Sequence, residues 1–298
     1  MPSFSQLLII GGSGFLGWHL VKAAAAQYDV SWTHCQHALT IAASPDAYRL
    51  DIQQPDEIRA VIEQVEPEVI VHTAAMTNAD LCETHRSLAH SLNVSGTRNV
   101  AECAEEVGAT LIYISTDLVF DGLHGNYRER SATKPVNYYG ETKLAGERVV
   151  KEVMSKYLIA RVALMYGNGN GVHGCFTDWM RDGLQHGREV TLFIDQYRTP
   201  LYVNDAAQAI LELAEKSPEN ETYHLGGGER LNRYEFGQKF CQIFGYDPKH
   251  LRAVAMNDIP SLVPRGADCS LNSHKAQKLL SFTLSDVANG LEKMKRGL

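Results

Sequence analysis

A cluster of glycines separates the first apolar run of the chain from the first segment of helical periodicity, in the stretch LLIIGGSGFLGWHL. Glycine permits a tight turn from a strand into a helix and lets the backbone approach a diphosphate closely. The first amides of the following helix supply free donors and a partial positive charge. We therefore predict a dinucleotide diphosphate site here, the alternative being a tight turn without a ligand. The predicted contacts are Gly11, Ser13, Gly14, Phe15, Leu16 and Gly17.

Apolar runs of strand length alternate with helical segments through the first half of the chain. The predicted strands are LLII from Leu7, VSWT from Val30, VIVHTAA from Val69, TLIYIST from Thr110 and YLIARVALMYG from Tyr157. The predicted helices are FLGWHLVKAAAAQ, PDEIRAVIEQV, one long helix ETHRSLAHSLNVSGTRNVAECAEEVG, and the segment after Tyr138. Several strands are continuous runs of Val, Ile and Leu, as in sheets covered on both faces. The pattern predicts an α/β fold with a Rossmann-like doubly wound parallel sheet.

The regular alternation weakens after about residue 167, where the Gly/Asn-rich loop GNGNGVHG begins. Short helices, a VTLFI strand and a helix from about Val203 follow. We expect residues 1–167 to form the dinucleotide-binding domain, to which residues 200–225 return. Residues 168–298 would form a smaller C-terminal substrate-binding lobe over the carboxyl ends of the strands, where open α/β sheets bind ligands.

The net charge restricts the possible binding partners, and the cysteine spacing bears on metal sites and disulfides. The formal net charge is −7, which argues against nucleic acid or an anionic membrane as the main partner. The six cysteines show no paired spacing, so neither a metal site nor a disulfide framework is predicted. The N-terminus lacks a basic region and its apolar run is too short to span a bilayer, so we expect a cytoplasmic protein.

The end of the second predicted strand bears on the choice of cofactor. An acid at this position grips the ribose hydroxyls of NAD. Here the strand ends with Thr33, His34, Cys35 and then His37. The missing carboxylate tolerates a 2′-phosphate, so we predict NADPH. NADH remains the alternative, because no arginine stands there to bind the phosphate.

The next two strand regions also end in candidate cofactor contacts, for the adenine and the nicotinamide ribose. Asp51 and Ile52 end the first region, and Thr73, Ala74 and Ala75 end the second. Asp51 has a second interpretation, as the cap of the helix that begins near Pro55.

Candidate catalytic groups lie in the stretches YISTDLVFDG and YYGETKLAGE. Tyr139 and Lys143 are one helical turn apart, so both lie on one helix face. A neighbouring ammonium favours the phenolate, and we expect Lys143 to lower the pKa of Tyr139. Thr116 ends the fourth main strand and would polarise a substrate carbonyl, with Asp117 beside it. This set suits hydride transfer to a ketone, with Tyr139 as proton donor and Lys143 on the cofactor ribose. Two alternatives involve no catalysis. Tyr139 and Lys143 could form a solvated pair on the surface of a helix, and Thr116 and Asp117 could belong to a turn or a helix cap.

With these motifs, the chain resembles the extended short-chain dehydrogenase/reductases, most closely the dTDP-4-dehydrorhamnose reductase group. The resemblance runs through GGSGFLG, NVSGTRNVAECAEEVGATLIYISTDLVFDG, PVNYYGETKLAGE and RTPLYVNDAAQAI. It implies catalytic roles for Thr116, Tyr139 and Lys143, with Asp117 near the substrate. It also implies reduction of a nucleotide-linked 4-keto-6-deoxysugar by NAD(P)H, and suggests a homodimer.

One departure separates the chain from related 4,6-dehydratases, which carry a glutamate after the strand-end aspartate. This chain has Leu118 there, so dehydration lacks its second acid. In the second lobe, Phe176 occupies a region that contacts the nucleotide-sugar in such enzymes. Arg198 and Arg265 would bind its diphosphate, or would instead form salt bridges. Ser115 is a further predicted substrate contact.

Two other functions fit the same motifs. An epimerase would hold NAD tightly and return the hydride, although the missing acid after the second strand argues against it. A non-catalytic subunit would bind a partner enzyme with a dinucleotide present, as the regulatory subunit of methionine adenosyltransferase does.

Overall fold

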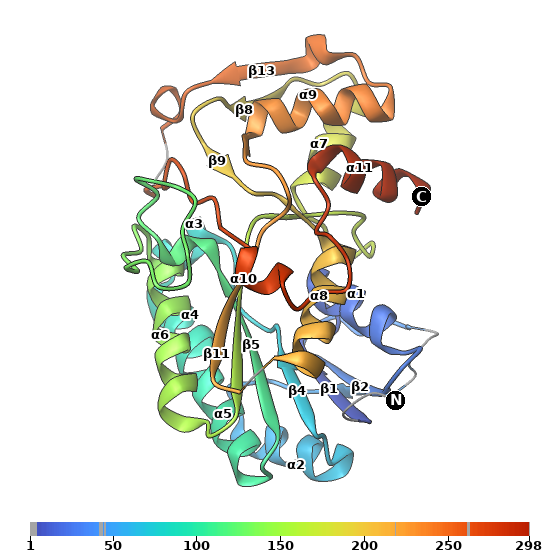
Figure 1. Ribbon diagram of the computed structural model, residues 1–298, viewed down its shortest axis with the longest axis vertical. Coiled ribbons are helices and arrows are strands. Elements are labelled where there is room, and N and C mark those ends of the chain that lie inside the picture. The colour runs from blue at the N-terminus through green and yellow to red at the C-terminus, as the bar shows by residue number, and fades with distance from the viewer. Residues whose placement is uncertain (1–4, 42–43, 45, 218, 261–262, 298) are drawn as a thin grey trace.

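The computed structural model describes residues 5–41, 44, 46–217, 219–260 and 263–297. Its centre is a seven-stranded parallel sheet with strand order β11-β6-β5-β4-β1-β2-β3 (Figure 1). The strands are β1 (Gln6–Ile10), β2 (Asp29–His34), β3 (Ala47–Arg49), β4 (Val69–His72), β5 (Thr110–Thr116), β6 (Tyr157–Val162) and β11 (Glu221–Leu225). The predicted α/β fold with a Rossmann-like doubly wound parallel sheet is confirmed.

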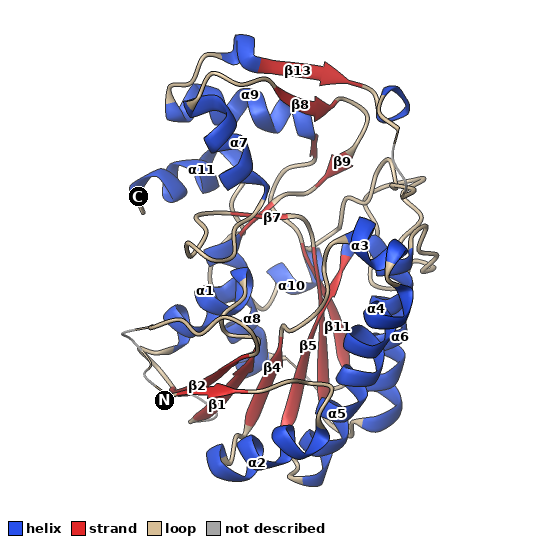
Figure 2. Ribbon diagram, turned by 180° about the vertical axis from the view of Figure 1, so that it is seen from behind, coloured by secondary structure: helices blue, strands red, loops and turns tan. Residues whose placement is uncertain are grey.

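Strand β1 shows why the central strands are continuous apolar runs. Leu7 and Ile9 pack in one core with helices α1 (Phe15–Ala24) and α8 (Val203–Lys216). Leu8 and Ile10 pack in a second core, on the opposite face, with α2 (Pro55–Val65), α5 (Gly96–Glu106) and α6 (Tyr138–Val153). Successive strand residues point to opposite faces, so a sheet covered on both faces needs an apolar residue at every position. Figure 2 shows these two helical layers.

The segment predicted as one long helix before β5 is helical over most of its length but is interrupted. The chain forms α3 (Ala79–Thr84), α4 (Arg86–His90), a π-helical turn η1 (Ser91–Ser95) and then α5. The π turn directs Asn93 inward, where its Oδ1 accepts from Met76 N at 2.8 Å and its Nδ2 donates to Thr142 Oγ1 at 3.0 Å. These tertiary hydrogen bonds favour the widened turn, and periodicity alone does not reveal them.

One strand of the sheet, β11, was not predicted, and the strand region predicted to end at Asp51 and Ile52 forms as β3, which ends at Arg49. The edge strand β3 is only three residues long and mostly exposed, so it carries little apolar signal. Strand β11 pairs with β6 over five residues, from Glu221 opposite Leu158 to Leu225 opposite Val162. It follows α8, so the chain returns to the large sheet after passing through the smaller lobe.

The smaller lobe lies over the carboxyl ends of the sheet and has its own apolar core. It is built from α7 (Phe176–Gln185), β8 (Val190–Phe193), α9 (Arg233–Phe244), β13 (Leu251–Val254) and α11 (Val287–Arg296). The predicted VTLFI strand forms as β8, which pairs in parallel with β13. Short elements complete the chain: η2 (Asp117–Val119), β7 (Met165–Tyr166), β9 (Tyr197–Arg198), β10 (Leu201–Tyr202), β12 (Leu231–Asn232), η3 (Pro248–His250), η4 (Met256–Asp258) and α10 (His274–Gln277).

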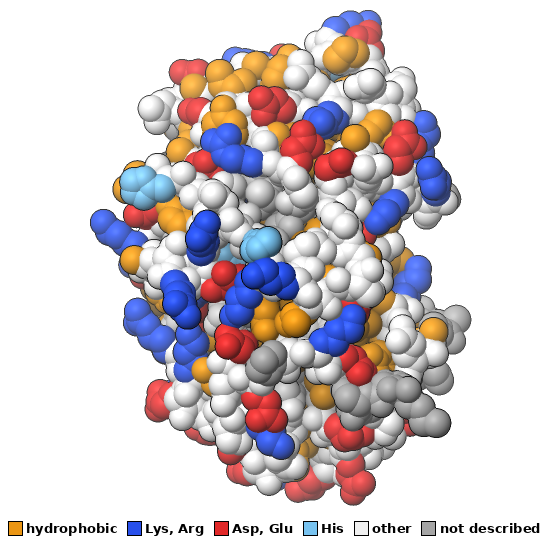
Figure 3. Space-filling model, in the orientation of Figure 1, with side chains coloured by type: hydrophobic (Ala, Val, Ile, Leu, Met, Phe, Trp, Pro, Cys, Tyr) orange, Lys and Arg blue, Asp and Glu red, His pale blue; other side chains and the backbone are white. Residues whose placement is uncertain are grey.

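The surface is of mixed charge where Figure 3 displays it. Basic and acidic side chains are interspersed with uncharged ones across that face (Figure 3). Within the described ranges, every helix is too short or too polar to cross a membrane.

Candidate functional site

A pocket of about 1010 Å³ lies where the smaller lobe meets the carboxyl ends of the parallel strands. One part of its wall comes from the glycine turn after β1 and from the residues after β2 and β4. The other part comes from the end of β5, the start of α6, and β9, α7 and α9 of the smaller lobe. The pocket therefore spans the region in which ligands of open α/β sheets bind.

The glycine turn has a conformation that lets the backbone approach a ligand closely. Gly11 has φ +90°, a left-handed conformation that favours glycine. A Cβ at Gly17 would collide with the carbonyl oxygen of Gly11, and one at Gly11 would lie 2.7 Å from Thr73 Oγ1. No side chain caps the first turn of α1, whose N-cap is Gly14. Uncapped amides facing a pocket are the arrangement that binds a diphosphate. Gly11, Ser13, Gly14, Phe15, Leu16 and Gly17 all line the pocket.

The strand-end residues predicted to contact the cofactor line the same pocket, namely Asp51, Ile52, Thr73, Ala74 and Ala75. The Thr73 hydroxyl donates to Ile10 O at 2.9 Å, which fixes the end of β4 against the glycine turn. Asp51 Oδ1 accepts from Gln53 N at 3.0 Å, which closes a turn before α2. The N-cap of α2 is Gln54 and no side chain caps it, so the interpretation of Asp51 as the helix cap is wrong.

The wall after β2 consists of Cys35, Gln36 and His37. Parallel pairing also sets Arg49 of β3 beside His34 of β2. This arginine ion-pairs with Glu57 at 3.2 Å, on the exposed edge of the sheet. Sequence reasoning found no arginine near this strand end because the β2–β3 pairing is not visible in the local sequence.

Tyr139, Lys143 and Thr116 come together on one side of the pocket. Asn137 begins α6 by accepting from Gly140 N at 2.9 Å through its side-chain oxygen. A Cβ at Gly140 would collide with the carbonyl oxygen of Leu118, so the glycine lets α6 pack tightly against the turn that follows Thr116. Tyr139 and Lys143 are both buried.

The pKa values of Tyr139 and Lys143 differ from those that the sequence predicts. Burial raises the pKa of Tyr139, the nearby Asp117 carboxylate raises it further, and the neighbouring Thr116 hydroxyl opposes the shift. Burial lowers the pKa of Lys143 to about 7, opposed by Glu147. The Lys143 Nζ lies 4.1 Å from the centroid of the Tyr113 ring on β5. The prediction that Lys143 lowers the pKa of Tyr139 is therefore wrong for this arrangement, because desolvation dominates both groups.

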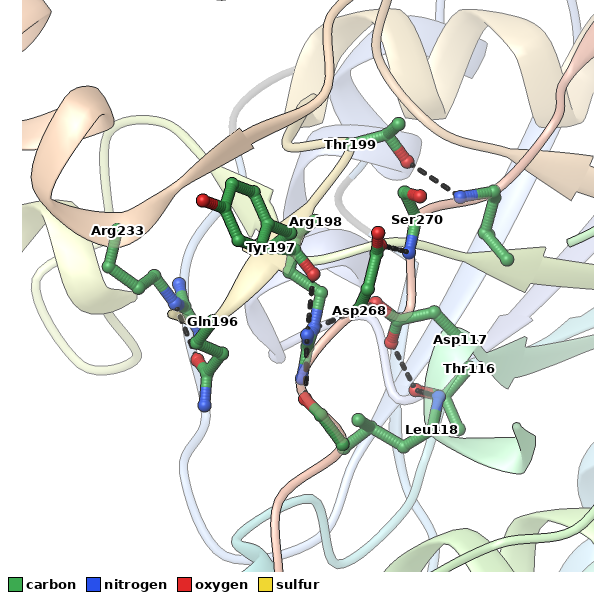
Figure 4. Close-up of polar contacts among 12 residues, drawn as sticks. Thr116, Asp117, Leu118, Gln196, Tyr197, Arg198, Thr199, Arg233, Asp268 and Ser270 are labelled. Carbon is green, nitrogen blue, oxygen red and sulfur yellow. Dashed lines mark hydrogen bonds and ion pairs between the residues drawn. The ribbon is translucent and has the colours of Figure 1, made fainter. Parts of the chain in front are cut away.

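Asp117 is a buried carboxylate at the base of the pocket (Figure 4). Its Oδ1 accepts from Thr116 Oγ1 at 3.1 Å, and its Oδ2 lies 3.4 Å from Arg198 Nε. Arg198 Nη1 donates to Tyr197 O at 2.6 Å and to Gly266 O at 3.1 Å. Burial raises the pKa of Asp117, and the charge of Arg198 opposes that shift. Arg198 lines the pocket, and its Nη1 is engaged within the protein.

The remaining predicted substrate contacts, Arg265, Ser115 and Phe176, also line the pocket, and each has a partner within the chain. Arg265 Nη2 ion-pairs with Asp80 at 3.1 Å. Ser115 Oγ donates to Glu147 Oε1 at 2.6 Å, which directs its proton away from a substrate. Phe176 begins α7, and the Arg233 guanidinium stacks over its ring at 5.0 Å from the centroid.

Arg233 is a site residue that sequence reasoning missed. It is the first residue of α9 and lines the pocket, with Nε donating to Gln196 Oε1 at 2.9 Å (Figure 4). Burial lowers the pKa of Arg233 to about 9, and the neighbouring charge of Arg198 acts in the same direction. Arg198, Arg233 and Arg265 thus bring positive charge to one side of the pocket, which favours an anionic ligand. The stretch ERLNRYEF contains a capped helix start, but nothing local shows that it faces the pocket.

This combination of sheet, glycine turn and Tyr139–Lys143 helix defines the class, because it is the architecture of the extended short-chain dehydrogenase/reductases. More narrowly, the chain belongs to the family described as RmlD substrate binding domain, which matches residues 5–297.

The similar proteins include members with different functions. The chain is 32% identical over 279 residues to methionine adenosyltransferase 2 subunit beta of Xenopus laevis, covering 92% of this chain and 82% of that protein. It is 30% identical over 276 residues to dTDP-4-dehydrorhamnose reductase of Mycobacterium tuberculosis, covering 91% and 86%. Among solved structures, dTDP-4-dehydrorhamnose reductase from Bacillus anthracis in complex with NADP superimposes with a TM-score of 0.87 at 28% identity, covering 99% of this chain and 100% of that one.

Proposed function

We propose that the protein is an NAD(P)H-dependent reductase of a nucleotide-linked 4-keto-6-deoxysugar, acting like the dTDP-4-dehydrorhamnose reductases. The observation that carries the proposal is the meeting of Thr116, Tyr139 and Lys143 at a pocket that also contains the glycine turn. A ketone reductase needs a proton donor beside its dinucleotide site, and this pocket has both features. The similarity to a reductase solved with NADP supports the same cofactor class.

The glycine turn and the uncapped start of α1 would hold the cofactor diphosphate. Asp51 and Ile52 would contact its adenosine half, and Thr73, Ala74 and Ala75 the ribose nearer the reacting ring. The pocket wall after β2 carries Cys35, Gln36 and His37 in place of an acid, which favours NADPH with NADH as the weaker alternative. When bound, the reduced nicotinamide supplies the hydride.

Tyr139 would donate the proton to the ketone oxygen. Burial raises the pKa of its phenol, so the group is protonated at neutral pH and ready to donate. Thr116, which lies in the same pocket wall, would polarise the same carbonyl. Lys143 would bind the cofactor ribose and balance the charge that Tyr139 acquires after transfer. Asp117 would lie near the substrate and orient Thr116.

The smaller lobe would bind the nucleotide-linked part of the substrate. Arg233 and Arg265 carry the positive charge that suits a diphosphate, and Arg198 adds to it while holding Asp117. Phe176 offers an aromatic face in the same wall. We accordingly assign dinucleotide binding to residues 1–167, with residues 200–225 returning to that domain, and substrate binding to residues 168–298.

The decisive experiment measures NADPH oxidation at 340 nm by the purified protein, with a panel of dTDP- and other nucleotide-linked 4-keto-6-deoxysugars. Turnover with at least one ketosugar is expected, and Tyr139→Phe should lower kcat by about 10²–10⁴-fold while leaving NADPH binding largely intact. Absence of turnover across the panel contradicts the proposal. NAD that copurifies, with sugar interconversion but no net NADPH consumption, would instead indicate an epimerase.

The similarity to methionine adenosyltransferase 2 subunit beta favours a second candidate, a regulatory subunit that binds a catalytic partner. Coexpression with a methionine adenosyltransferase catalytic subunit, followed by affinity capture, tests it directly. A stable complex with altered synthetase kinetics, together with no ketosugar turnover, would support this candidate over the reductase.

A further inference from the structure

The buried lysine of α6 has an aromatic ring as its partner. Lys143 is 3% exposed, and its Nζ lies 4.1 Å from the centroid of the Tyr113 ring on β5. In the part of the chain that the structure describes, Lys143 forms no salt bridge with an acid. A buried ammonium needs compensation for the water that it loses, and the negative face of an aromatic ring can provide part of it.

Tyr113 is fixed against α6 by close packing. It is fully buried and belongs to the core that β5 shares with α2, α5 and α6. Its hydroxyl donates a long hydrogen bond to Lys143 O at 3.5 Å. A Cβ at Gly146 would collide with this hydroxyl, so that glycine of α6 makes room for the ring. Tyr113 therefore contacts both the backbone and the side chain of Lys143.

The neighbour of Tyr113 on β4 brings no negative charge to the lysine. His72 is paired with Tyr113 in the sheet, with the ring centroids 5.8 Å apart. Thr97 Oγ1 donates to Asn93 O at 2.8 Å, so it accepts from His72 Nε2 at 3.2 Å, which places the ring proton on Nε2. Burial lowers the pKa of His72 to about 3, and the charge of Lys143 acts in the same direction, so the imidazole is neutral.

The carboxylates near the start of α6 have other cations as partners. Both oxygens of Glu147 accept from Arg161, at 2.8 and 2.7 Å, and Asp117 Oδ2 lies 3.4 Å from Arg198 Nε. Burial lowers the pKa of Lys143 to about 7, and the charge of Glu147 opposes that shift. Direct support for the amine therefore comes from the aromatic ring of β5.

We propose that Tyr113 is a positioning residue for Lys143: the face of its ring holds the lysine at the pocket wall as an ammonium, one helical turn from Tyr139. The phenol of Tyr139 is neutral because burial raises its pKa, so it does not supply a compensating charge. The role of the ammonium in reduction rests on the proposed function, but its charge can be measured without turnover.

The test is competitive acetylation with trace acetic anhydride over a range of pH, with the Lys143 peptide quantified by mass spectrometry. Two variants of nearly equal shape differ in the charge of the ring face: Tyr113→Phe, and Tyr113 replaced by trifluorophenylalanine through amber suppression. Fluorine withdraws electron density from the ring. The fluorinated variant should therefore have a pH midpoint of Lys143 labelling about one unit below that of Tyr113→Phe, a tenfold change in acidity.

The ring of Tyr223 on β11 provides the matched control. Tyr223 is also buried, and Lys275 Nζ lies 4.3 Å from the centroid of its ring. The same two substitutions at Tyr223 alter a ring beside a different lysine, so they should leave the Lys143 midpoint unchanged.

Tyr113→Leu provides a second test that does not depend on the fluorinated side chain. It removes the ring and should also lower the Lys143 midpoint by about one unit, although the lost volume costs stability. Cooperative thermal melts identify the folded variants. Equal midpoints in Tyr113→Phe and its fluorinated counterpart overturn the proposal, and so does a wild-type midpoint in folded Tyr113→Leu. Lack of ketosugar turnover by the wild type overturns the proposed function instead, and leaves this measurement intact.

Discussion

The guanidinium of Arg198 and the carboxylate of Asp117 face each other inside the protein, with Nε 3.4 Å from Oδ2 and both side chains 5% exposed. One residue belongs to β9 of the smaller lobe, and the other follows β5 of the large sheet. The pair therefore links the two parts of the chain at the base of the pocket. It also ties the position of Asp117, next to Thr116, to the placement of the smaller lobe.

Replacing this arginine should destabilise the fold strongly. Arg198→Met leaves the Asp117 carboxylate buried without its cation, which costs about 3–5 kcal/mol in free energy of unfolding. Arg252→Met is the control, because Arg252 pairs with Glu189 on the surface, where both side chains are more than half exposed. That change should cost less than about 1 kcal/mol. Urea unfolding of the two variants measures the difference, and equal losses would contradict the assignment.

The glycine turn predicts a graded effect on cofactor binding. A Cβ at Gly17 collides with the backbone of Gly11, whereas one at Gly14 meets its nearest atom, Gly11 O, at 3.2 Å. Gly17→Ala should therefore weaken NADPH binding far more than Gly14→Ala, by about tenfold or more relative to it. Fluorescence titration with NADPH gives both dissociation constants. Similar constants for the two variants would show that the turn does not hold the diphosphate.

Two buried histidines predict a loss of stability in mild acid. Burial lowers the pKa of His72 and of His224 to about 3. Between that value and the unfolded pKa of about 6.5, the unfolded chain binds more protons, so stability falls as the pH drops through this window. Each histidine contributes up to about 1.4 kcal/mol per pH unit there.

Urea unfolding between pH 4 and 7 tests this dependence. His224→Gln should reduce the slope of unfolding free energy against pH, whatever its effect on the absolute stability. The exposed His274 provides the control, and His274→Gln should leave the slope unchanged. An unaltered slope in the His224 variant would mean that this histidine does not titrate as its burial requires.

Replacing Arg233 should weaken binding of the substrate and leave binding of the cofactor unchanged. Its guanidinium lines the smaller-lobe wall and is held by Gln196 and Phe176. If it binds the substrate diphosphate, Arg233→Gln should raise KM for the nucleotide-linked ketosugar by about 10–100-fold, the loss of one charge-assisted contact. The NADPH dissociation constant should stay within about twofold of wild type. Arg252→Gln, on the outer surface, is the control and should change neither constant.

The sequence alone determined the architecture of the first half and the composition of much of the pocket wall. Continuous apolar strands, a glycine junction and the helix that follows Tyr138 are local patterns, and each follows from backbone geometry over a few residues. The spacing of Tyr139 and Lys143 is likewise fixed by the helical repeat.

Tertiary structure decided what depends on distant segments. Strand β11 joins the sheet through its register with β6, and Arg233 reaches the pocket because α9 begins beside it. Sequence reasoning placed a cation beside Tyr139 and inferred an acidic phenol, but burial raises the pKa of that phenol. The physical reason is the same in each case: local patterns fix backbone conformation, whereas desolvation and long-range pairing depend on what the folded chain packs around a side chain.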